Sequence, residues 1–470
     1  MSNQHIPVIA ILGAGSTGLA AGMRLSKHNH HVILIEKDDH VGGLAGGIHI
    51  NGNTYEYGPH TFHTTDPEIL NDIKSLMGDE LIPYHRTIKI KFLGNYFKFP
   101  LAIRDVLFKL PPQTVIHAGL SFVWHFVTGW IWKPKEENSE TLLKRYYGNV
   151  LYEIFFKTYI TSVWGITPAE FSPSFARERI PRLNILEFID QFMSLIKRRL
   201  GHAVQVEGYV EKVEGNLYTT RKGFSLITER MADAITSRGG RIELNATVTR
   251  IIRDGERIQA IEYEQNGETR RIEPHAVINT LPINEVMLMM QPQLDTSVVQ
   301  AAQALKFRAL VFVGLLVRRP HVLPSSFMYF RQHSFNRISD LAQFGFHVTP
   351  DCSTLLVAEI SCDVNDRAWN DETFAKQTVL DDLVAEKLLT RDEIIETHVF
   401  RAQYAYPIYT LHYEEHLAIL LNAITQMENI EPAGRQGRFQ YVNTHIAMKM
   451  GYQAADRLVA KLDQDKPPLA

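Results

Sequence analysis

The chain begins with a short apolar run that leads directly into three spaced glycines and then into a helical pattern. Residues 6–18 read IPVIAILGAGSTG, so Gly13, Gly15 and Gly18 follow a strand-like segment and open a helix. The first glycine permits a tight turn, the second lets backbone N–H groups approach phosphate, and the third lets the helix pack closely on the strand. This pattern predicts a Rossmann-type site for a dinucleotide pyrophosphate at a helix N-terminus.

The next strand and the acidic residue at its end support the same prediction. Val32 to Ile35 form a second buried-strand pattern, and Glu36 stands where a carboxylate accepts both hydroxyls of an adenosine ribose. A carboxylate at that place repels the additional phosphate of NADP. The glycine pair Gly42-Gly43 follows. NAD dehydrogenases usually lack this pair, and the segment resembles that of the two-dinucleotide-binding flavoproteins, which implies FAD as the cofactor.

Two later segments extend this resemblance and imply a fold. Residues 239–248 (GGRIELNATV) resemble the strand whose valine backbone, here that of Val248, meets the adenine. Residues 277–282 (VINTLP) resemble the strand that returns to the FAD domain. The expected fold is α/β: a Rossmann-like two-dinucleotide-binding FAD domain with an interleaved α+β substrate domain. We assign 1–70, 206–290 and 421–470 to the FAD-binding domain, 71–205 to a mainly helical substrate or cap region, and 291–420 to the substrate-domain sheet and helices.

Periodicity predicts the elements between these motifs. A mainly helical insertion is expected from about 70 to 200, and strand-like runs alternate with turns over 305–365. Helices are predicted over 226–237 and from about 444 to 461, and strands near 241–252 and 257–264. Asn266-Gly267 indicates a hairpin turn.

Composition excludes several other classes of protein. At 470 residues with 45% hydrophobic residues, the chain is too long for one compact core and indicates two interleaved domains. A net charge of −3 predicts no basic surface for nucleic acid. Cys352 and Cys362 are too few for a disulfide framework, so we expect reduced thiols in a cytoplasmic protein without a metal site or a secretory signal.

One apolar segment bears on where the protein works. Residues 114–132 (TVIHAGLSFVWHFVTGWIW) are followed by Lys133 and Lys135. His117, His125 and two glycines argue against a membrane span, and the three tryptophans suit an interface better than a bilayer centre. We expect a buried helix of the second domain. A peripheral membrane contact is the alternative.

Further motifs resemble the UDP-galactopyranose mutases, in the same order along nearly the whole chain. Residues 57–64 (YGPHTFHT) resemble the GAHIFHT segment beside the flavin ring, whose first histidine, here His60, contacts the cofactor. Four other matches follow: 151–165 (LYEIFFKTYITSVWG) with LYE-x-FF-K-x-Y…WG, 179–182 (RIPR) with RIPVR, 305–310 (LKFRAL) with a YRSL segment, and 434–441 (GRQGRFQY) with GRLG-x-Y-x-Y.

The resemblance implies roles for individual residues. Arg182 and Arg308 would clamp a diphosphate, which suits the planar guanidinium group, and with His60 they are the predicted catalytic residues. Either arginine alone could instead form a salt bridge, and Trp164 could stack on uracil or a sugar or simply pack. The predicted substrate-binding residues are His63, Trp164, Arg182, Arg308 and Tyr441. The predicted cofactor-binding residues are Gly13, Gly15, Ser16, Thr17, Gly18, Glu36, Lys37, Gly42, Gly43, Leu44, Gly58, Pro59, His60, Val248, Thr280, Gly434, Arg435, Tyr441 and Asn443.

The resemblance implies an unusual reaction and leaves alternatives. In the mutases, reduced flavin attacks the anomeric carbon, UDP leaves, and the sugar ring opens and recloses at the other size without net redox. This chain has Pro59 in the flavin segment, SVWG for KQWG, and YVNTH at 441–445 for YYDMD, which removes two acidic positions. It therefore also fits FAD-dependent oxidoreductases of the amine oxidase superfamily, such as protoporphyrinogen oxidases and carotenoid desaturases. A scaffold without flavin is a third reading. The predicted partner is a small-molecule substrate, with a nucleotide sugar as the first candidate; the oligomeric state is left open.

Overall fold

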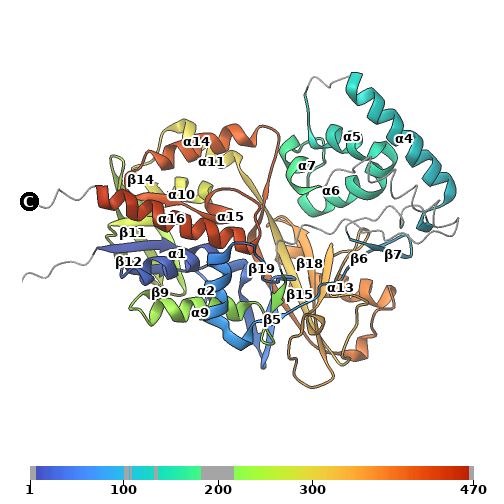
Figure 1. The fold of residues 1–470 in the computed structure, drawn as a ribbon, viewed down its shortest axis with the longest axis horizontal. Helices are drawn as coiled ribbons and strands as arrows, with labels where there is room; N and C mark the ends of the chain where they lie inside the picture. Colours follow the sequence, from blue (N-terminus) through green and yellow to red (C-terminus); the bar gives the residue numbers. More distant parts are fainter. Residues whose placement is uncertain (1–6, 100–104, 106–107, 132–135, 181–215, 465–470) are drawn as a thin grey trace, which may run out of the picture.

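The computed structural model describes residues 7–99, 105, 108–131, 136–180 and 216–464 (Figure 1). The predicted strand that leads into the glycine motif lies at the centre of a five-stranded sheet. The strands in spatial order are β20 (Ile430–Pro432), β13 (Ala276–Asn279), β1 (Val8–Leu12), β2 (His31–Ile35) and β9 (Arg241–Glu243). All neighbouring pairs are parallel. β1 and β2 are buried after their first residue, as a sheet covered on both faces requires. The predicted α/β fold class is confirmed.

Helices α1 (Ser16–Lys27), α9 (Ser225–Thr236) and α16 (Thr444–Gln464) pack beside this sheet. α1 lies very close to α16, because a Cβ at Gly451 would stand 2.3 Å from the Thr17 carbonyl oxygen. The helices predicted over 226–237 and 444–461 are both present, the second three residues longer. This packing fixes where α1 begins, and with it the direction of its N-terminal N–H groups.

A four-stranded sheet adjoins the parallel one, in the order β12 (Glu268–Ile272), β11 (Arg257–Gln265), β10 (Ala246–Asp254) and β14 (Met290–Gln291). Asn266 and Gly267 join β11 to β12 with φ of 54° and 80°, which confirms the predicted hairpin turn. Strand structure is present where it was predicted near 241–252, but as two strands instead of one. The extended backbone is interrupted at Asn245, whose φ is 53°, so β9 and β10 belong to different sheets.

The third layer is a seven-stranded mixed sheet that contains the strand-like runs predicted over 305–365. Its order is β19 (Ile394–Ile408), β15 (Lys306–Val317), β18 (Thr354–Cys362), β17 (Arg337–Asp340), β16 (Phe327–Tyr329), β6 (Ile88–Phe92) and β7 (Asn95–Lys98). Alternate residues of β15 face two different cores. Val311 and Val313 pack with helix α13 (Glu372–Ala385), whereas Leu310 and Phe312 pack with Tyr55 and Phe400.

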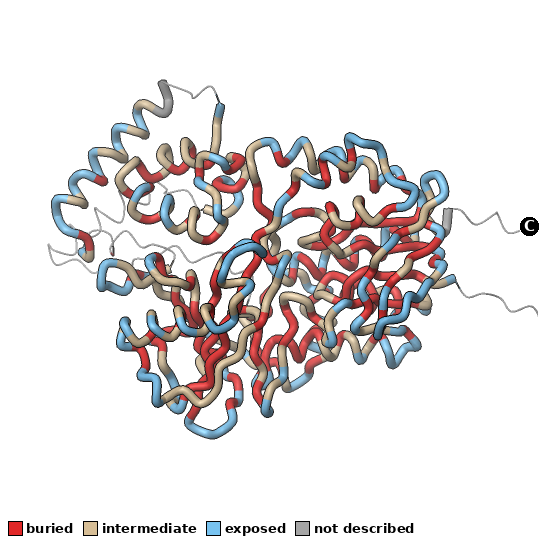
Figure 2. The backbone as a smooth tube through the Cα atoms, turned by 180° about the vertical axis from the view of Figure 1, so that it is seen from behind, coloured by how far each residue is buried: buried red, intermediate tan, exposed pale blue. Residues whose placement is uncertain are grey.

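A helical lobe stands at one corner of the molecule, away from the parallel sheet (Figure 1). It consists of α4 (Pro112–Ile131), α5 (Ser139–Leu151), the π-helical turn η3 (Tyr152–Lys157), α6 (Thr158–Trp164) and α7 (Pro173–Arg179). The expectation that 114–132 is a buried helix is wrong. Figure 2 shows α4 as largely exposed and half-buried backbone, and Ala118 is its one fully buried position among the residues whose side chains are described.

The remaining described elements connect these layers. They are β3 (Gly47–Ile50), β4 (Asn53–Glu56), α2 (Pro67–Met77), β5 (Ile82–Pro83), β8 (Tyr218–Thr219), α10 (Ile283–Met289), α11 (Thr296–Ala304), α12 (Arg367–Asn370), α14 (Tyr413–Thr425), α15 (Gly434–Gly437) and the short 3-10 turns η1 (Gly43–Ala45), η2 (Gly78–Glu80), η4 (Leu341–Phe344) and η5 (Arg391–Glu393). The residue boundaries assigned to the two domains stay a prediction. Among the helices that the structure describes, none has the length and apolar character that a membrane span needs.

Candidate active site

The two glycine-rich segments of the sequence meet where β1 and β2 end. Gly15 pairs with Gly42 in an isolated parallel bridge, and the Gly42 N–H donates to the Ala14 carbonyl at 2.8 Å. A Cβ at Gly18 would lie 2.0 Å from the Gly13 carbonyl oxygen, a backbone atom. The bare backbone allows the close approach that a pyrophosphate needs. This group is named the glycine cradle: Gly13, Gly15, Gly18, Gly42 and Gly43.

Glu36 closes the glycine cradle from the end of β2. It is buried, and its carboxylate oxygens accept the N–H groups of Ala14 at 2.7 Å and Asp38 at 3.1 Å. Burial raises the pKa of Glu36, while the two N–H donors favour the charged form. β10 is held beside this residue, because the Ala246 N–H donates to the Glu36 carbonyl at 2.8 Å. The residues predicted to contact ribose and adenine, Glu36 and Val248, therefore lie on adjoining segments.

The C-terminal glycine motif reaches the same place. Gly434 opens α15 with φ of 80°, and a Cβ there would lie 2.3 Å from Thr17 Oγ1 at the start of α1. Thr280 Oγ1 donates to the Leu12 carbonyl at 2.7 Å. A Cβ at Gly13 would lie 2.7 Å from this Thr280 Oγ1. Three segments that are distant in the sequence thus meet around the start of α1, where Gly434 and Gly13 leave room for the side chains of Thr17 and Thr280. This arrangement fits the adenosine diphosphate end of FAD.

Four further predicted cofactor residues lie around the glycine cradle. Ser16 is the first residue of α1, and Leu44 is half-buried in η1. Lys37 is exposed and forms an ion pair with Asp38 at 3.6 Å. Asn443 is exposed just before α16, where its carbonyl accepts the Ala447 N–H at 2.9 Å. Their part in cofactor binding stays a prediction.

His60 lies in the turn after β4, next to Gly58 and Pro59. Its Nδ1 is enclosed without a hydrogen-bond partner among the described residues, and its ring centre is 5.7 Å from that of Phe224. Burial and the cations of Arg337 and Arg435 lower the pKa of His60 to about 4. The imidazole is therefore neutral near pH 7, and an enclosed ring nitrogen is available to a bound ligand.

A buried ion pair stands directly behind this turn. Arg337 Nε and Nη2 donate to the two oxygens of Glu359 at 2.6 and 2.7 Å, across the register pair that joins β17 to β18. Gly58, with φ of 99°, touches this pair, because a Cβ there would lie 2.8 Å from Glu359 Oε1. The bidentate contact with the carboxylate keeps the pKa of Arg337 high. The pair fixes the position of the Gly58–His60 segment against the seven-stranded sheet.

Tyrosine rings and guanidinium groups lie next to this pair. The Tyr441 ring has the Arg179 guanidinium 3.4 Å and the Arg435 guanidinium 4.1 Å from its centre, and the Tyr406 ring meets it edge-on at 5.0 Å. The Nε of Arg435 is enclosed without a partner in the described chain. Tyr159 lies 5.9 Å from Tyr329, ring to ring, and within electrostatic range of Arg337, Tyr406 and Tyr441.

Arg331 extends this group toward the helical lobe. It is 7% exposed, and its guanidinium carbon lies 4.3 Å from the ring centre of Phe92 and 5.6 Å from that of Phe155. Its Nε and Nη1 have no hydrogen-bond partner in the described chain, and burial lowers its pKa to about 10. It interacts electrostatically with Tyr159. We name the whole group the arginine–tyrosine cluster: Arg179, Arg331, Arg337, Arg435, Tyr159, Tyr329, Tyr406 and Tyr441.

Arg308 is held by the protein itself. Its Nε donates to the Val163 carbonyl at 3.2 Å, its Nη2 to the Ser361 carbonyl at 3.3 Å, and its Nη1 pairs with Asp363 at 2.7 Å. A Cβ at Gly165 would lie 2.6 Å from this guanidinium. Arg308 therefore ties β15 to the end of α6. Its predicted catalytic and substrate-binding roles stay predictions.

Arg182 and Trp164 were also predicted to bind substrate. Arg182 lies outside the described residues, so its pairing with Arg308 stays a prediction. Trp164 is half-buried and meets the rings of Phe175 at 4.9 Å and Tyr406 at 6.1 Å. It packs in the helical lobe and touches the arginine–tyrosine cluster through Tyr406.

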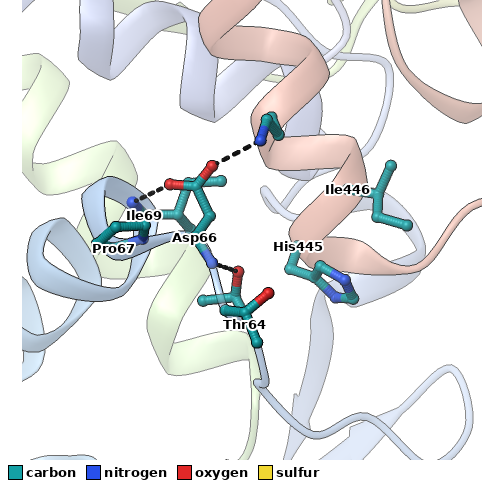
Figure 3. Close-up of a pocket in the computed structure, with 8 residues that line it drawn as sticks. Thr64, Asp66, Pro67, Ile69, His445 and Ile446 are labelled. Carbon is teal, nitrogen blue, oxygen red and sulfur yellow. Dashed lines mark hydrogen bonds and ion pairs between the residues drawn. The ribbon is translucent and has the colours of Figure 1, made fainter. Parts of the chain in front are cut away.

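His63 lies beside a separate surface pocket of about 420 Å³ between the starts of α2 and α16 (Figure 3). Its ring centre is 4.5 Å from that of His445, which lines the pocket. Figure 3 shows Asp66 in the pocket wall, where it accepts hydrogen bonds from the α2 backbone and pairs with Lys449 at 2.8 Å. No group of three or more His, Cys, Asp or Glu in the described ranges could hold a metal ion.

Sequence reasoning missed the residues in the middle of the cluster. Arg331, Arg337 and Tyr329 lie in no motif that was singled out, and Tyr159 and Arg179 stood in quoted motifs without a role. One signal was present: Glu359 is a lone acidic residue in the apolar strand TLLVAEISC. A charge in a buried strand needs a partner, so this pattern could have indicated an ion pair at this position, although it does not show which arginine supplies the cation.

Comparisons with known proteins agree with this geometry. The family model described as flavin containing amine oxidoreductase matches residues 16–459. A Klebsiella pneumoniae protein named as a probable UDP-galactopyranose mutase is 25% identical over 216 residues, 45% of this chain and 54% of that protein. A 4,4'-diapophytoene desaturase of Staphylococcus aureus is 23% identical over 284 residues, 56% and 53% of the two chains. The chain thus spans about half the length of these curated relatives.

A crystal structure of reduced UDP-galactopyranose mutase has the same fold. It superposes with a TM-score of 0.79 at 18% identity, and the alignment covers 97% of this chain and 94% of that one. The family model spans most of the chain, including Gly18, Gly42 and Gly43 of the glycine cradle and the Gly434-Arg435 motif. The chain therefore belongs to the flavin-containing amine oxidoreductase family, as an FAD-dependent enzyme with a fold like that of UDP-galactopyranose mutase.

Proposed function

We propose that this flavoenzyme acts on a nucleotide sugar, or on a related glycan precursor that carries a diphosphate, as a mutase-type isomerase. The observation that carries the proposal is the charge of the arginine–tyrosine cluster. It contains four guanidinium groups, and Arg337 is paired with the buried carboxylate of Glu359. A partly buried cation is costly unless an anion or hydrogen-bond acceptor reaches it. The cluster therefore favours an anionic ligand.

The remaining cations match a diphosphate. Arg435 belongs to the motif predicted to contact the cofactor, which leaves Arg179 and Arg331 for the substrate. Two guanidinium groups suit the two negative charges and the planar oxygen pairs of a diphosphate. Burial raises the pKa of Tyr159 and Tyr406, so both phenols stay protonated and can donate hydrogen bonds to phosphate or sugar oxygens.

The protein residues would position the reaction. When bound, reduced FAD supplies a nucleophilic nitrogen for covalent catalysis at an anomeric carbon. The Arg337–Glu359 pair holds the Gly58–His60 segment in place, and neutral His60 offers a hydrogen bond without adding charge. Arg179 and Arg331 would stabilise the negative charge on the departing diphosphate. Aromatic rings around them limit the access of water.

The direct test is isomerisation under controlled redox conditions. The purified protein, with FAD confirmed by its absorbance near 450 nm, is incubated with a panel of UDP- and dTDP-hexoses before and after reduction with dithionite. We expect pyranose and furanose forms to interconvert only with the reduced protein. Absence of turnover across the whole panel contradicts the proposal.

A second candidate is an FAD-dependent oxidoreductase of the same superfamily. The match to a 4,4'-diapophytoene desaturase over 56% of the chain favours it. An oxidoreductase is expected to bleach the oxidised flavin on anaerobic mixing with its substrate, whereas a mutase leaves the oxidised flavin unchanged. Anaerobic absorbance measurements with nucleotide sugars and with apolar polyenes therefore separate the two candidates.

We also propose a cytoplasmic protein with a peripheral membrane contact through residues 114–132. The observation in its favour is the exposed apolar face of α4. Leu120 and Trp124, one helical turn apart on that face, are 65% and 67% exposed. Such a face is costly in water and favourable at a lipid surface.

A further inference from the structure

The exposed apolar side chains of the molecule gather in one region. Of the twelve large apolar residues exposed among the described residues, nine lie between positions 93 and 127. Five form a stripe on α4 at helical spacing: Ile116, Leu120, Val123, Trp124 and Val127. The spacing places them on one side of the helix, and Leu120, Val123, Trp124 and Val127 line one shallow surface hollow. An apolar stripe of this extent on a surface helix indicates a partner.

The other side of α4 is already occupied. Ala118 is buried, Ser121 Oγ accepts the Asn149 N–H at 2.8 Å, and a Cβ at Gly148 would lie 2.6 Å from the Phe122 nitrogen. These contacts join α4 to α5 on its inner face. The apolar stripe therefore faces away from α5. The helix itself lies at the outer edge of the molecule (Figure 1).

The β6–β7 hairpin continues this surface beyond the start of α4. Lys109, three residues before α4, donates to the Tyr96 carbonyl at 2.5 Å and lies over the Phe97 ring. Leu93 at the hairpin turn is 57% exposed, and Phe108 is 70% exposed. The hairpin, Phe108 and the α4 stripe are named the α4 surface.

The stretch of sequence that carries the α4 surface is rich in positive charge. Residues 86–135 contain eight Lys or Arg and one acidic residue, Asp105, which gives a net charge of +7 in a chain whose total is −3. Within the described part, Lys98 is exposed, and Lys89 and Lys91 flank the Tyr96 ring at 5.7 and 4.4 Å. Apolar residues bordered by cations match an anionic lipid surface, where each basic residue near the headgroups contributes about 1 kcal/mol.

We infer that the α4 surface docks on a bilayer that contains anionic phospholipid, with the apolar stripe in the acyl boundary and the lysines at the headgroups. The inference rests on the peripheral contact proposed above and extends it to the hairpin and to a lipid class. A second copy of the chain is the weaker occupant, because two-fold pairing of this surface would bring two strongly positive regions together.

The test is sedimentation of the full-length FAD-loaded protein with vesicles. One set contains phosphatidylcholine alone, and the other contains phosphatidylcholine with phosphatidylglycerol. We expect strong binding to the anionic vesicles that weakens with added salt, and weak binding to the neutral ones. Equal binding to both sets, or no binding to the anionic set, overturns the inference.

Two matched pairs of variants locate the contact. Leu120→Ser with Trp124→Ser should lower partition onto anionic vesicles about tenfold or more, because both side chains leave the acyl boundary. Its control, Val364→Ser with Ile419→Ser, changes exposed apolar residues elsewhere and should bind like wild type. Lys89→Gln with Lys98→Gln should reduce the salt dependence, whereas Lys222→Gln with Lys387→Gln should not. Wild-type binding by the Leu120/Trp124 variant contradicts the docking surface.

Two measurements keep this inference separate from the reaction and from dimerisation. Flavin content and nucleotide-sugar turnover are measured without vesicles on the same variants, and both should equal the wild-type values. A variant that loses vesicle binding but keeps full turnover supports the docking surface without contradicting the proposed reaction. A wild-type protein that binds anionic vesicles but shows no turnover contradicts the proposed reaction without contradicting the docking surface. Analytical ultracentrifugation tests the second occupant: a wild-type dimer that the Leu120/Trp124 variant dissociates overturns lipid docking.

Discussion

The glycine cradle and the arginine–tyrosine cluster are built from different parts of the chain. The cradle consists of backbone, and its shape depends on side chains that are absent: a Cβ at Gly18 would stand 2.0 Å from a carbonyl oxygen. The cluster consists of long side chains from α6, α7, β16, β17, β19 and α15 and the segments that follow them. The first region therefore leaves almost no room for an added atom, whereas we expect the second to lose one side chain and keep its frame.

The largest effect is expected in the cradle. Gly18→Ala should abolish stable FAD binding, because the new Cβ can be placed only by moving α1 away from β1. The measurement is flavin content by absorbance, with FAD titration and thermal unfolding of the protein. Gly119→Ala is the control, since a Cβ there meets nothing within 4 Å in helix α4. Wild-type FAD affinity in Gly18→Ala would remove the distinction between the two regions.

The second effect lies in the cluster. Arg331→Met should keep FAD and the fold but weaken UDP binding by about 30-fold or more, because a charge-assisted contact worth roughly 2 kcal/mol or more is lost. Calorimetric titration with UDP measures this directly. The matched control is Arg238→Met, an exposed arginine just after α9 that is not part of the cluster. Unchanged UDP affinity in Arg331→Met would show that this buried guanidinium serves the packing of Phe92 and Phe155 instead.

The same contrast explains what the sequence could predict. The glycine fingerprint, Glu36 and Gly434-Arg435 are local patterns whose spacing is set by one turn and one helix, so they identified the fold and the cofactor. The cluster depends on pairings such as Arg337 with Glu359 and Tyr406 with Tyr441, which arise only when β15, β17, β18 and β19 assemble. α4 shows a further limit, since an apolar helix has the same composition whether a core or a ligand covers it.

Arg308 is a buried arginine outside the cluster, and its substitution should change the stability of the protein more than its affinity for UDP. Its guanidinium is bound by two carbonyl oxygens and Asp363, so Arg308→Lys should lower the free energy of unfolding by about 1–3 kcal/mol through lost hydrogen bonds. We expect a change in UDP affinity of less than about threefold. Denaturant unfolding and UDP titration measure the two quantities together. A large loss of turnover with unchanged stability would instead support the catalytic role predicted from the sequence.

The smallest effect concerns Glu56, which lies between the two regions, two residues before Gly58. Its side chain is buried at the start of α9, where Oε1 accepts the Ser225 N–H at 3.1 Å, and burial raises its pKa to about 8. An acid whose folded pKa is raised stabilises the fold fully below its unfolded value of 4.5, and this contribution is lost as pH rises toward 8. Wild type should therefore lose about 1 kcal/mol relative to Glu56→Gln between pH 7 and pH 8.

Urea unfolding of both proteins at closely spaced pH values measures this difference. Glu268→Gln is the control, because that carboxylate is 76% exposed and is not among the charges that raise the pKa of Glu56. Parallel stability curves for wild type and Glu56→Gln would mean that Glu56 is ionised in the folded protein. In that case the N–H groups at the start of α9 stabilise its charge, and the segment leading to His60 is anchored by a carboxylate rather than by a neutral acid.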